Sequence, residues 1–172
     1  EKKFGFRPMA YYVSGYHIFC IDALGFPVRR VFGFHSVDEL ELLKQRANAR
    51  KDISNPPIED SITNRDYQKD AIRSICNVFQ DQKRRRGIIV MATGTGKTRV
   101  SISLVKVLME ANWVKNVLFL ADRTSLVRQA HKNFNKLLPN VTTSMFTGTS
   151  NSGSTTFYKC PDSDFIDQEN YQ

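Results

Sequence analysis

The sequence lacks the features of a membrane or secreted protein. Within its 172 residues, no apolar run approaches the roughly 20 residues that a membrane-spanning helix needs. Its three cysteines, Cys20, Cys76 and Cys160, are odd in number and too widely spaced for a zinc knuckle. We therefore expect reduced thiols, a cytoplasmic location and no membrane partner. The chain starts at Glu1 without a methionine or an apolar signal segment, which favours an internal piece of a longer protein.

Negative charge is scarce in the middle of the chain. The net charge is +8, but residues 61–140 alone carry fifteen basic and five acidic side chains. A basic surface of this kind predicts a polyanionic partner such as a nucleic acid. A solvated basic face without a ligand is the alternative, and we place Arg85 on such a face, at the exposed end of a helix.

The strongest motif is the glycine-rich stretch MATGTGKT at residues 91–98. The β-branched run at residues 87–91 before it predicts a buried parallel strand, and the apolar stretch after it predicts a helix. A strand, a glycine-rich turn and a helix in this order are typical of a phosphate-binding loop. Met91 stands where the pattern G-x-x-x-x-G-K-[ST] has its first glycine.

The residue types of this loop suit a nucleoside triphosphate. Gly94 and Gly96 can adopt positive φ, which lets backbone N–H groups and the helix N-terminus face the phosphates. Lys97 adds a positive charge, and the Thr98 hydroxyl is placed to ligate Mg²⁺. The predicted nucleotide ligands in the loop are Thr93, Gly94, Thr95, Gly96, Lys97 and Thr98.

Two parts of different character flank a linker. Aromatic-rich strands within residues 8–34 predict a small antiparallel meander. Ser36 and Glu39 form a capping box that opens a helix through about Arg50. We expect its core face to carry Val37, Leu40, Leu43 and Ala47. Residues 54–61, SNPPIEDS, break every periodicity and predict a linker.

Alternating helices and strands follow the linker. A helix from Asn64 is expected to place Ala71, Ile72, Ile75, Cys76 and Phe79 in a core. The apolar run at residues 116–121 predicts a strand, so residues 88–121 would form one right-handed βαβ unit. A helix at residues 124–138 and a short strand near 141–146 complete the pattern, and residues 147–156 read as a loop.

Three segments, in this order, resemble the first three helicase motifs of superfamily 2. They are RDYQKDAI, IIVMATGTGKT and VLFLADRTSLVRQA. Their spelling looks most like the motor (R) subunit of type I restriction enzymes. The front segment, from RPMAYYVSGYHIFCID to HSVDELELLKQR, is similar to the stretch that joins the nuclease domain of that subunit to its motor. Type III restriction translocases share the motor motifs but fit the front segment less well.

This resemblance, over roughly residues 7–138, implies an α/β fold with a P-loop, RecA-like parallel sheet. Residues 1–53 would be the C-terminal edge of the nuclease domain, and residues 62–172 the first part of the N-terminal motor lobe. The implied parent is an ATP-dependent, Mg²⁺-dependent double-stranded DNA translocase and endonuclease. Its implied partners are double-stranded DNA and the methyltransferase and specificity subunits.

The resemblance also implies roles outside the loop. Gln68 would read adenine, because its amide can pair with the N6 and N7 edge, and Arg65 and Tyr67 would lie near the base or ribose. Arg123, Thr124 and Gln129 would contact DNA phosphates at a helix N-terminus.

One alternative assigns Asp122 to a Walker B strand beside Mg²⁺. Superfamily 2 motors use an Asp-Glu pair there, and Arg123 follows Asp122, so the DNA-contact role is preferred. No apolar strand that ends in such a pair follows the glycine-rich loop, and no second motor lobe follows it either. We therefore expect the chain alone to bind ATP without hydrolysing it.

Other classes of protein are compatible with parts of the pattern. Another superfamily 2 helicase or a type III-like translocase would share the motor motifs. A non-enzymatic DNA-binding module could carry a vestigial loop. A GTPase is disfavoured, since no guanine-reading N-K-x-D element occurs. The carboxylates of residues 1–3 and 81–83 are assigned to no nuclease site.

Overall fold

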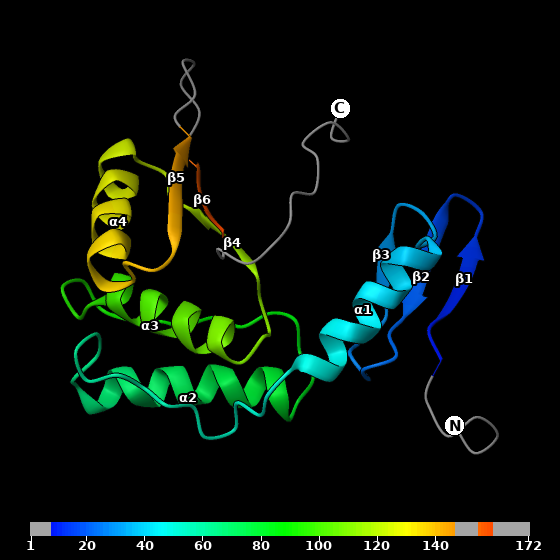
Figure 1. Ribbon diagram of the computed structural model, residues 1–172, viewed down its shortest axis with the longest axis horizontal. Helices are drawn as coiled ribbons and strands as arrows, with labels where there is room; N and C mark the ends of the chain where they lie inside the picture. The colour runs from blue at the N-terminus through cyan, green and yellow to red at the C-terminus, as the bar shows by residue number, and fades with distance from the viewer. Residues whose placement is uncertain (1–7, 147–154, 160–172) are drawn as a thin grey trace.

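The structure, a computed structural model, describes residues 8–146 and 155–159. Two parts are visible in Figure 1. The front unit, residues 8–50, contains β1 (Ala10–Ser14), β2 (His17–Ile21), β3 (Arg29–Val31) and α1 (Val37–Ala49). The remainder contains α2 (Asp66–Gln80), α3 (Lys97–Glu110), β4 (Asn116–Leu120), α4 (Thr124–Leu137), β5 (Thr142–Phe146) and β6 (Thr155–Lys159).

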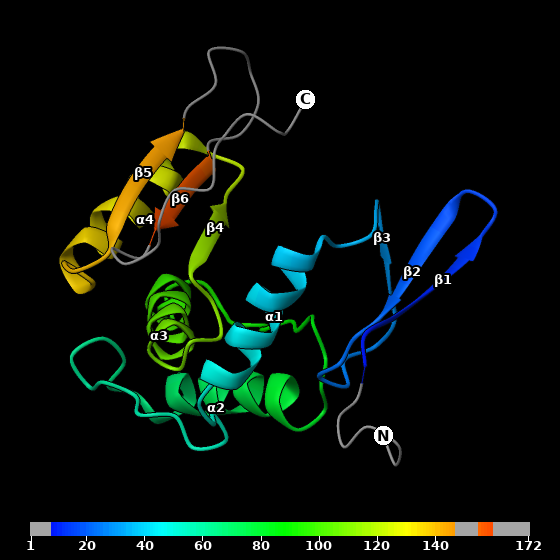
Figure 2. The same cartoon turned by 45° about the vertical axis from the view of Figure 1, so that its right-hand side comes forward.

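The front unit confirms the predicted meander and helix. Its three strands pair antiparallel in the order β1-β2-β3, and Gly15 supplies a positive φ of 56° in the first turn. The capping box forms as expected: the Ser36 hydroxyl accepts a hydrogen bond from the Glu39 backbone N–H at 3.2 Å, and the Glu39 carboxylate accepts one from the Ser36 N–H at 2.7 Å. Helix α1 lies between the front sheet and helices α2 and α3 (Figure 2).

The expected core face of α1 is not buried. Helix α1 contains no buried residue, and Val37 is 71% exposed. A helical period shows which residues share a face, but burial of that face needs an apolar partner, and the described residues supply too little apolar surface to cover this one.

The helices of the second part form two hydrophobic clusters. One joins α2 to α3 and includes the predicted core residues Ile72 and Cys76, which are fully buried. The other packs α4 on α3 and the sheet, with the Phe134 ring in an edge-to-face contact with Phe119 at 5.9 Å between centroids. Ile53 and Ile62, at either end of the predicted linker, are also buried. The linker is irregular in conformation but is anchored to the core at both ends.

The expected parallel sheet is not present among the described residues. The sheet of the second part has the order β4-β6-β5, and β6 pairs antiparallel with both neighbours. The strand β6 was not predicted, because it overlaps the end of a loop-like, serine- and glycine-rich stretch. The chain is therefore a mixed α/β structure, but with an antiparallel sheet in place of the predicted parallel one.

The predicted strand at residues 87–91 does not form either. This segment has no strand pairing, and Ile88 and Val90 are 89% and 91% exposed. A strand gains its stability from hydrogen bonds to a neighbour, and β4, the expected neighbour, pairs only with β6. Residues 88–121 therefore do not form the predicted βαβ unit.

Two cysteines lie in the described parts of the chain. Cys20 and Cys76 are buried free thiols. Burial raises the pKa of the Cys76 thiol to about 11. Cys160, like residues 1–3, lies outside the described residues. No described helix has both the length and the apolar character to cross a bilayer.

Candidate nucleotide site

The glycine-rich loop runs directly into helix α3. Gly96 is the N-cap of this helix and adopts a left-handed backbone with φ 89° and ψ 33°. Gly94 also has a positive φ, at 79°. These are the conformations that the two glycines were expected to supply, and they leave the first turn of α3, with Lys97 and Thr98, next to the loop.

Lys97 and Thr95 hold the loop together. The Lys97 ammonium donates hydrogen bonds to the carbonyls of Met91 at 3.2 Å and Ala92 at 3.1 Å. The Thr95 hydroxyl donates to the same Ala92 carbonyl at 2.7 Å. The lysine charge is thus held within the loop by carbonyl groups, which a phosphate could replace as a partner.

The N-terminal end of helix α2 contacts the loop through two side chains. The Thr95 carbonyl accepts hydrogen bonds from the Gln68 amide at 2.8 Å and from the Tyr67 hydroxyl at 3.0 Å. Arg65 in turn donates to the Tyr67 hydroxyl at 2.9 Å. The sequence predicted a shared site for these residues, which are 27 and 28 positions from Thr95 along the chain.

The placement of Gln68 refines the role expected for it. Its side chain is only 3% exposed, and its Oε1 atom is buried without a hydrogen-bond partner. A Cβ at Gly96 would lie 2.5 Å from its Nε2 atom. Gln68 therefore packs against the loop backbone, and its Oε1 acceptor and second N–H are the groups of its amide that the hydrogen bond to Thr95 leaves unused.

The residues present fit a bound triphosphate. Two left-handed glycines, an amine held only by carbonyl groups and the N-terminus of a 14-residue helix occur together. The unpartnered Oε1 of Gln68 is an acceptor suited to an exocyclic amine. The described residues contain no group of three or more His, Cys, Asp or Glu side chains that could hold a metal ion by itself. The expected role of Thr98, a ligand of Mg²⁺ carried by the nucleotide, requires no such group.

Of the three residues predicted to contact DNA, two lie together in the structure. Arg123 is the N-cap of helix α4, and Thr124 is its first residue. Gln129 is exposed, but it follows Thr124 by five residues, which places it about 140° around the helix. Arg123 and Thr124 can therefore share a ligand at the helix N-terminus, whereas Gln129 faces another direction.

The alternative assignment of Asp122 receives no support from its contacts. Its carboxylate lies 3.8 Å from the Arg123 guanidinium, and both side chains are largely exposed. No ion pair or hydrogen bond joins Asp122 to Lys97 or Thr98 in the described part of the chain. An exposed pair of this kind contributes little to stability.

The expectation for Arg85 was wrong. Helix α2 ends at Gln80, and the Arg85 guanidinium forms an ion pair with Asp22 at 2.5 Å. Its Cζ atom also lies 4.6 Å from the centroid of the Phe26 ring. Arg85 therefore contacts the front unit instead of occupying a solvated helix end. No linear signal could have shown this, because Asp22 and Arg85 are 63 positions apart.

The comparison with family models identifies the class of protein. Residues 61–169 match the model of the family described as "Type III restriction enzyme, res subunit", so this chain belongs to that family. The match covers the loop, helix α2 and helix α4, and it leaves the front unit outside.

Individual relatives fall into two groups. The chain is 32% identical over 117 residues to DNA 3'-5' translocase XPB2 of Sulfurisphaera tokodaii, a match that covers 68% of this chain and 24% of the translocase. It is 41% identical over 64 residues to the EcoKI endonuclease subunit, a type I restriction enzyme of Escherichia coli K12, covering 37% of this chain and 5% of that subunit.

A third relative agrees with the second group. A type I restriction endonuclease subunit of Staphylococcus saprophyticus is 36% identical over 72 residues, covering 42% of this chain and 8% of the subunit. The predicted resemblance to type I restriction subunits is thereby confirmed over part of the chain. The matches span from 5% to 24% of the length of these relatives. No solved structure matches the chain.

Proposed function

We propose that this chain is the ATP-binding portion of an ATP-dependent double-stranded DNA translocase of the type I restriction kind. The observation that carries the proposal is the joining of α2 to the glycine-rich loop, where Gln68 and Tyr67 both donate to the Thr95 carbonyl. Membership of the restriction subunit family and the type I relatives support the same conclusion.

In this proposal each loop residue has a separate task. The amides of Thr93 to Thr98 and the N-terminus of α3 bind the phosphates, and Lys97 leaves the Met91 and Ala92 carbonyls to neutralise their charge. Thr98 holds the Mg²⁺ that accompanies the nucleotide. Arg65 and Gln68 orient the base. When bound, ATP supplies the energy that a translocase uses to move along DNA.

The DNA partner is proposed from charge and from helix geometry. Residues 61–140 have a strong basic excess, and Arg123 with Thr124 stands at the N-terminus of α4. A helix N-terminus and an arginine together suit a backbone phosphate and read no sequence. The chain would therefore bind duplex DNA without specificity and with a strong dependence on salt.

The assignment of the front part follows the same resemblance. We propose that residues 1–53 form the C-terminal edge of a nuclease domain, that residues 54–61 are the linker, and that residues 62–172 begin a RecA-like motor lobe. In the parent enzyme, the methyltransferase and specificity subunits would be the protein partners. Because its substrates are cellular DNA and ATP, the enzyme would work in the cytoplasm.

A second candidate function is favoured by one comparison. The longest of the matches reported above is to a 3'-5' DNA translocase that is not named as a restriction enzyme. Another superfamily 2 helicase or a type III-like translocase would use the same nucleotide loop. A non-enzymatic DNA-binding module with a vestigial loop would lack nucleotide binding altogether.

Calorimetric titration with Mg·ATP tests the proposal. The unaltered chain should bind, and Lys97→Ala should weaken binding by about tenfold to a hundredfold, the range for a hydrogen bond to a charged group. Lys132→Ala, an exposed lysine of α4, is the matched control and should bind like the unaltered chain. If the unaltered chain does not bind Mg·ATP, or if both variants lose the same affinity, the result would favour a DNA-binding module with a vestigial loop.

A further inference from the structure

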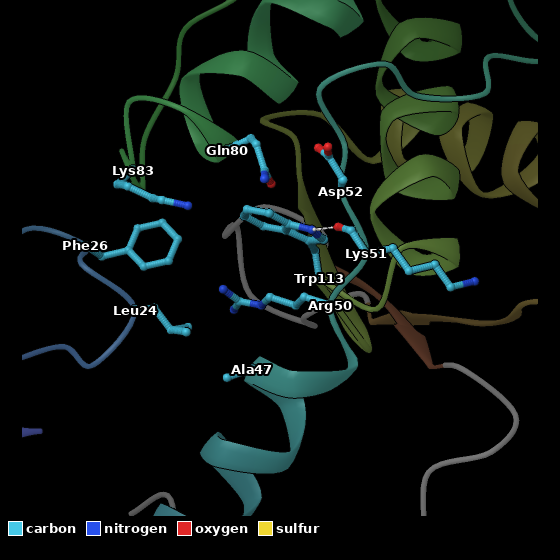
Figure 3. A pocket seen from close by; sticks show the side chains of 9 residues that line it. All are labelled: Leu24, Phe26, Ala47, Arg50, Lys51, Asp52, Gln80, Lys83 and Trp113. Atoms are coloured by element: carbon cyan, nitrogen blue, oxygen red, sulfur yellow. Dashed lines mark hydrogen bonds between the residues drawn. The ribbon is translucent and has the colours of Figure 1, made fainter. Parts of the chain in front are cut away.

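A pocket lies where the front unit meets the ends of helices α2 and α3. Its cavity has a volume of about 230 Å³, several times the roughly 30 Å³ that one water molecule occupies in the liquid. Figure 3 shows the Lys83 and Arg50 side chains extending into it beside the rings of Phe26 and Trp113. The cavity bounded by these four residues is called the junction pocket below.

Cations outnumber carboxylates on the wall of the junction pocket. Arg50, Lys51 and Lys83 line it, against the single carboxylate of Asp52. That carboxylate accepts hydrogen bonds from the backbone N–H and the hydroxyl of Ser54, each at 2.7 Å. Within the described parts of the chain, neither Arg50 nor Lys83 forms an ion pair. The pocket therefore carries positive charge that the protein itself does not neutralise.

Arg50 is held by aromatic rings instead of by an anion. Its guanidinium lies 4.8 Å from the centroid of the Trp113 ring and 5.7 Å from that of Phe26. Its Nε atom is buried and has no hydrogen-bond partner. The neighbouring Asp22 carboxylate is already paired with Arg85 at 2.5 Å. Burial lowers the pKa of Arg50, since the charged form loses hydration. An anion in the pocket would supply the compensation that a desolvated cation needs.

Lys83 occupies a backbone position that suits glycine. Its φ is 51°, in the left-handed region that side chains of L-residues disfavour. The Arg84 N–H donates to the Val78 carbonyl at 3.0 Å across the same turn, which follows α2. A glycine would form this turn with less strain, whereas a positive charge in the pocket requires the lysine.

We propose that the junction pocket binds a phosphate group between the Arg50 guanidinium and the Lys83 ammonium. A guanidinium offers a planar pair of donors that fits two phosphate oxygens, and an ammonium adds a compact charge. The aromatic rings beside them keep water away and so strengthen both interactions. Residues 83–86, KRRR, are the longest run of basic residues in the chain. Such a run favours a phosphate of a nucleic-acid backbone over a free ion.

This inference deepens the DNA-binding part of the proposed function and rests on it. The pocket is built from residues other than the glycine-rich loop and the N-terminus of α4, so it adds a second place at which a DNA strand contacts the chain. A phosphate held there would lie between the front unit and the second part. The front unit would then take part in DNA binding through Arg50.

Salt titrations of duplex DNA binding, followed by fluorescence anisotropy with the full chain, test the site. Arg50→Gln and, independently, Lys83→Gly should each weaken binding by about tenfold, because each removes a charged hydrogen-bond donor. Each should also lower the slope of log K against log salt by about 1, the effect of one lost phosphate contact. Lys44→Gln removes an exposed cation of α1 and is the matched control, with DNA binding unchanged.

Two measurements separate loss of binding from loss of structure. Lys83→Gly relieves the positive φ, so its urea midpoint should be equal to or higher than that of the unaltered chain. Circular dichroism of Arg50→Gln should show the helix content of the unaltered chain. A lower affinity for DNA in these two folded variants then reports on the pocket.

Calorimetric titration with inorganic phosphate distinguishes a backbone phosphate from a free ion. It is made in the Lys97→Ala chain, in which the glycine-rich loop has lost its cation. A backbone ligand predicts no detectable heat at phosphate concentrations below 1 mM, a limit of about −4 kcal/mol in binding free energy. A free-ion ligand predicts binding that Arg50→Gln and Lys83→Gly, added to Lys97→Ala, both abolish.

The outcomes separate this inference from the proposed function. Weaker DNA binding in both pocket variants supports a backbone phosphate in the pocket, and loss of phosphate binding alone supports a free ion there. Binding of both ligands that matches Lys44→Gln in both pocket variants overturns the inference. It leaves the proposed function standing if the unaltered chain binds Mg·ATP and DNA. If the unaltered chain binds neither DNA nor phosphate, the inference and the DNA partner fail together, and Mg·ATP binding still decides the nucleotide site.

Discussion

Replacing Gly96 with alanine adds one atom, a Cβ, at the point where the loop, α2 and α3 meet. Gly96 has a φ of 89°, a conformation that side chains of L-residues rarely adopt. A Cβ there would lie 2.5 Å from the Gln68 Nε2 atom. Gly94 is a close comparison, because its φ is 79° but an added Cβ would meet nothing within 4 Å.

The expected costs differ for that reason. A left-handed backbone costs an alanine roughly 1–2 kcal/mol, and this applies to both positions. At Gly96 the new methyl group must also displace the Gln68 amide, which is 3% exposed and has little room to move. Loss of its hydrogen bond to Thr95 adds about 0.5–1.5 kcal/mol. We therefore expect Gly96→Ala to lower the free energy of unfolding by about 2–3 kcal/mol and Gly94→Ala by about 1–2 kcal/mol.

Urea denaturation of the single and double variants measures the difference. In a Gln68→Ala background, Gly96→Ala should cost only the backbone strain, so the double-mutant cycle should give a coupling of about 1 kcal/mol. The same cycle with Gly94→Ala should give none. Equal costs for Gly94→Ala and Gly96→Ala, or no coupling between Gly96 and Gln68, would refute the close packing of α2 on the loop.

Three further predictions concern other parts of the chain. The pKa of the Cys76 thiol is raised to about 11 in the folded chain, whereas the unfolded chain loses this proton near pH 8.5. The free energy of unfolding should therefore fall by about 2–3 kcal/mol between pH 8.5 and 11. Urea titrations of Cys76→Ala should show a smaller fall. Arg123→Glu should weaken binding to duplex DNA and lower the slope of log K against log salt by about 1, whereas the same change at the exposed Arg86 should do less; equal losses would mean that the charge is diffuse. Ile88→Thr should change the free energy of unfolding by less than about 0.5 kcal/mol, because Ile88 is 89% exposed. Ile72→Ala in the core should lower it by about 2–5 kcal/mol. A large loss of stability in Ile88→Thr would support the predicted buried strand at residues 87–91.

Local chemistry explains what the sequence predicted well. The capping box of Ser36 and Glu39 depends on residues three positions apart, and it forms as expected. Helix α2 buries the predicted Ile72, Ile75 and Cys76 because helical periodicity and an available core agree there. The glycines of the loop adopt the left-handed backbone that the motif requires.

Failures occur where an element depends on a distant partner. Residues 87–91 have the composition of a buried strand, but composition does not supply the neighbouring strand that would accept their hydrogen bonds. The strand β6 forms because it pairs with β4 on one side and β5 on the other. No local pattern at residues 155–159 predicts this pairing. Asp22 and Arg85 likewise meet only through the arrangement of the two parts.

The sequence predicted that Gln68 lies close to the glycine-rich loop, but not how it packs there. Motif order placed Gln68 near the loop, and the structure brings its amide to the Thr95 carbonyl. The buried position of Gln68 and its contact with Gly96 could not be read from the sequence, because they depend on the angle at which α2 meets α3. This packing limits which atoms of Gln68 remain for a base.

The central claim is that α2 and the glycine-rich loop together form one adenine nucleotide site. Competition titrations with ATP and GTP test it most directly, because Lys97 and the loop amides contact only phosphates, whereas Gln68 can distinguish the bases. The unaltered chain should prefer ATP by about tenfold to a hundredfold, the range for a good amide–base pair. Gln68→Ala should remove that preference, and Lys97→Ala should weaken both nucleotides alike. An unchanged ATP-to-GTP ratio in Gln68→Ala would contradict the claim.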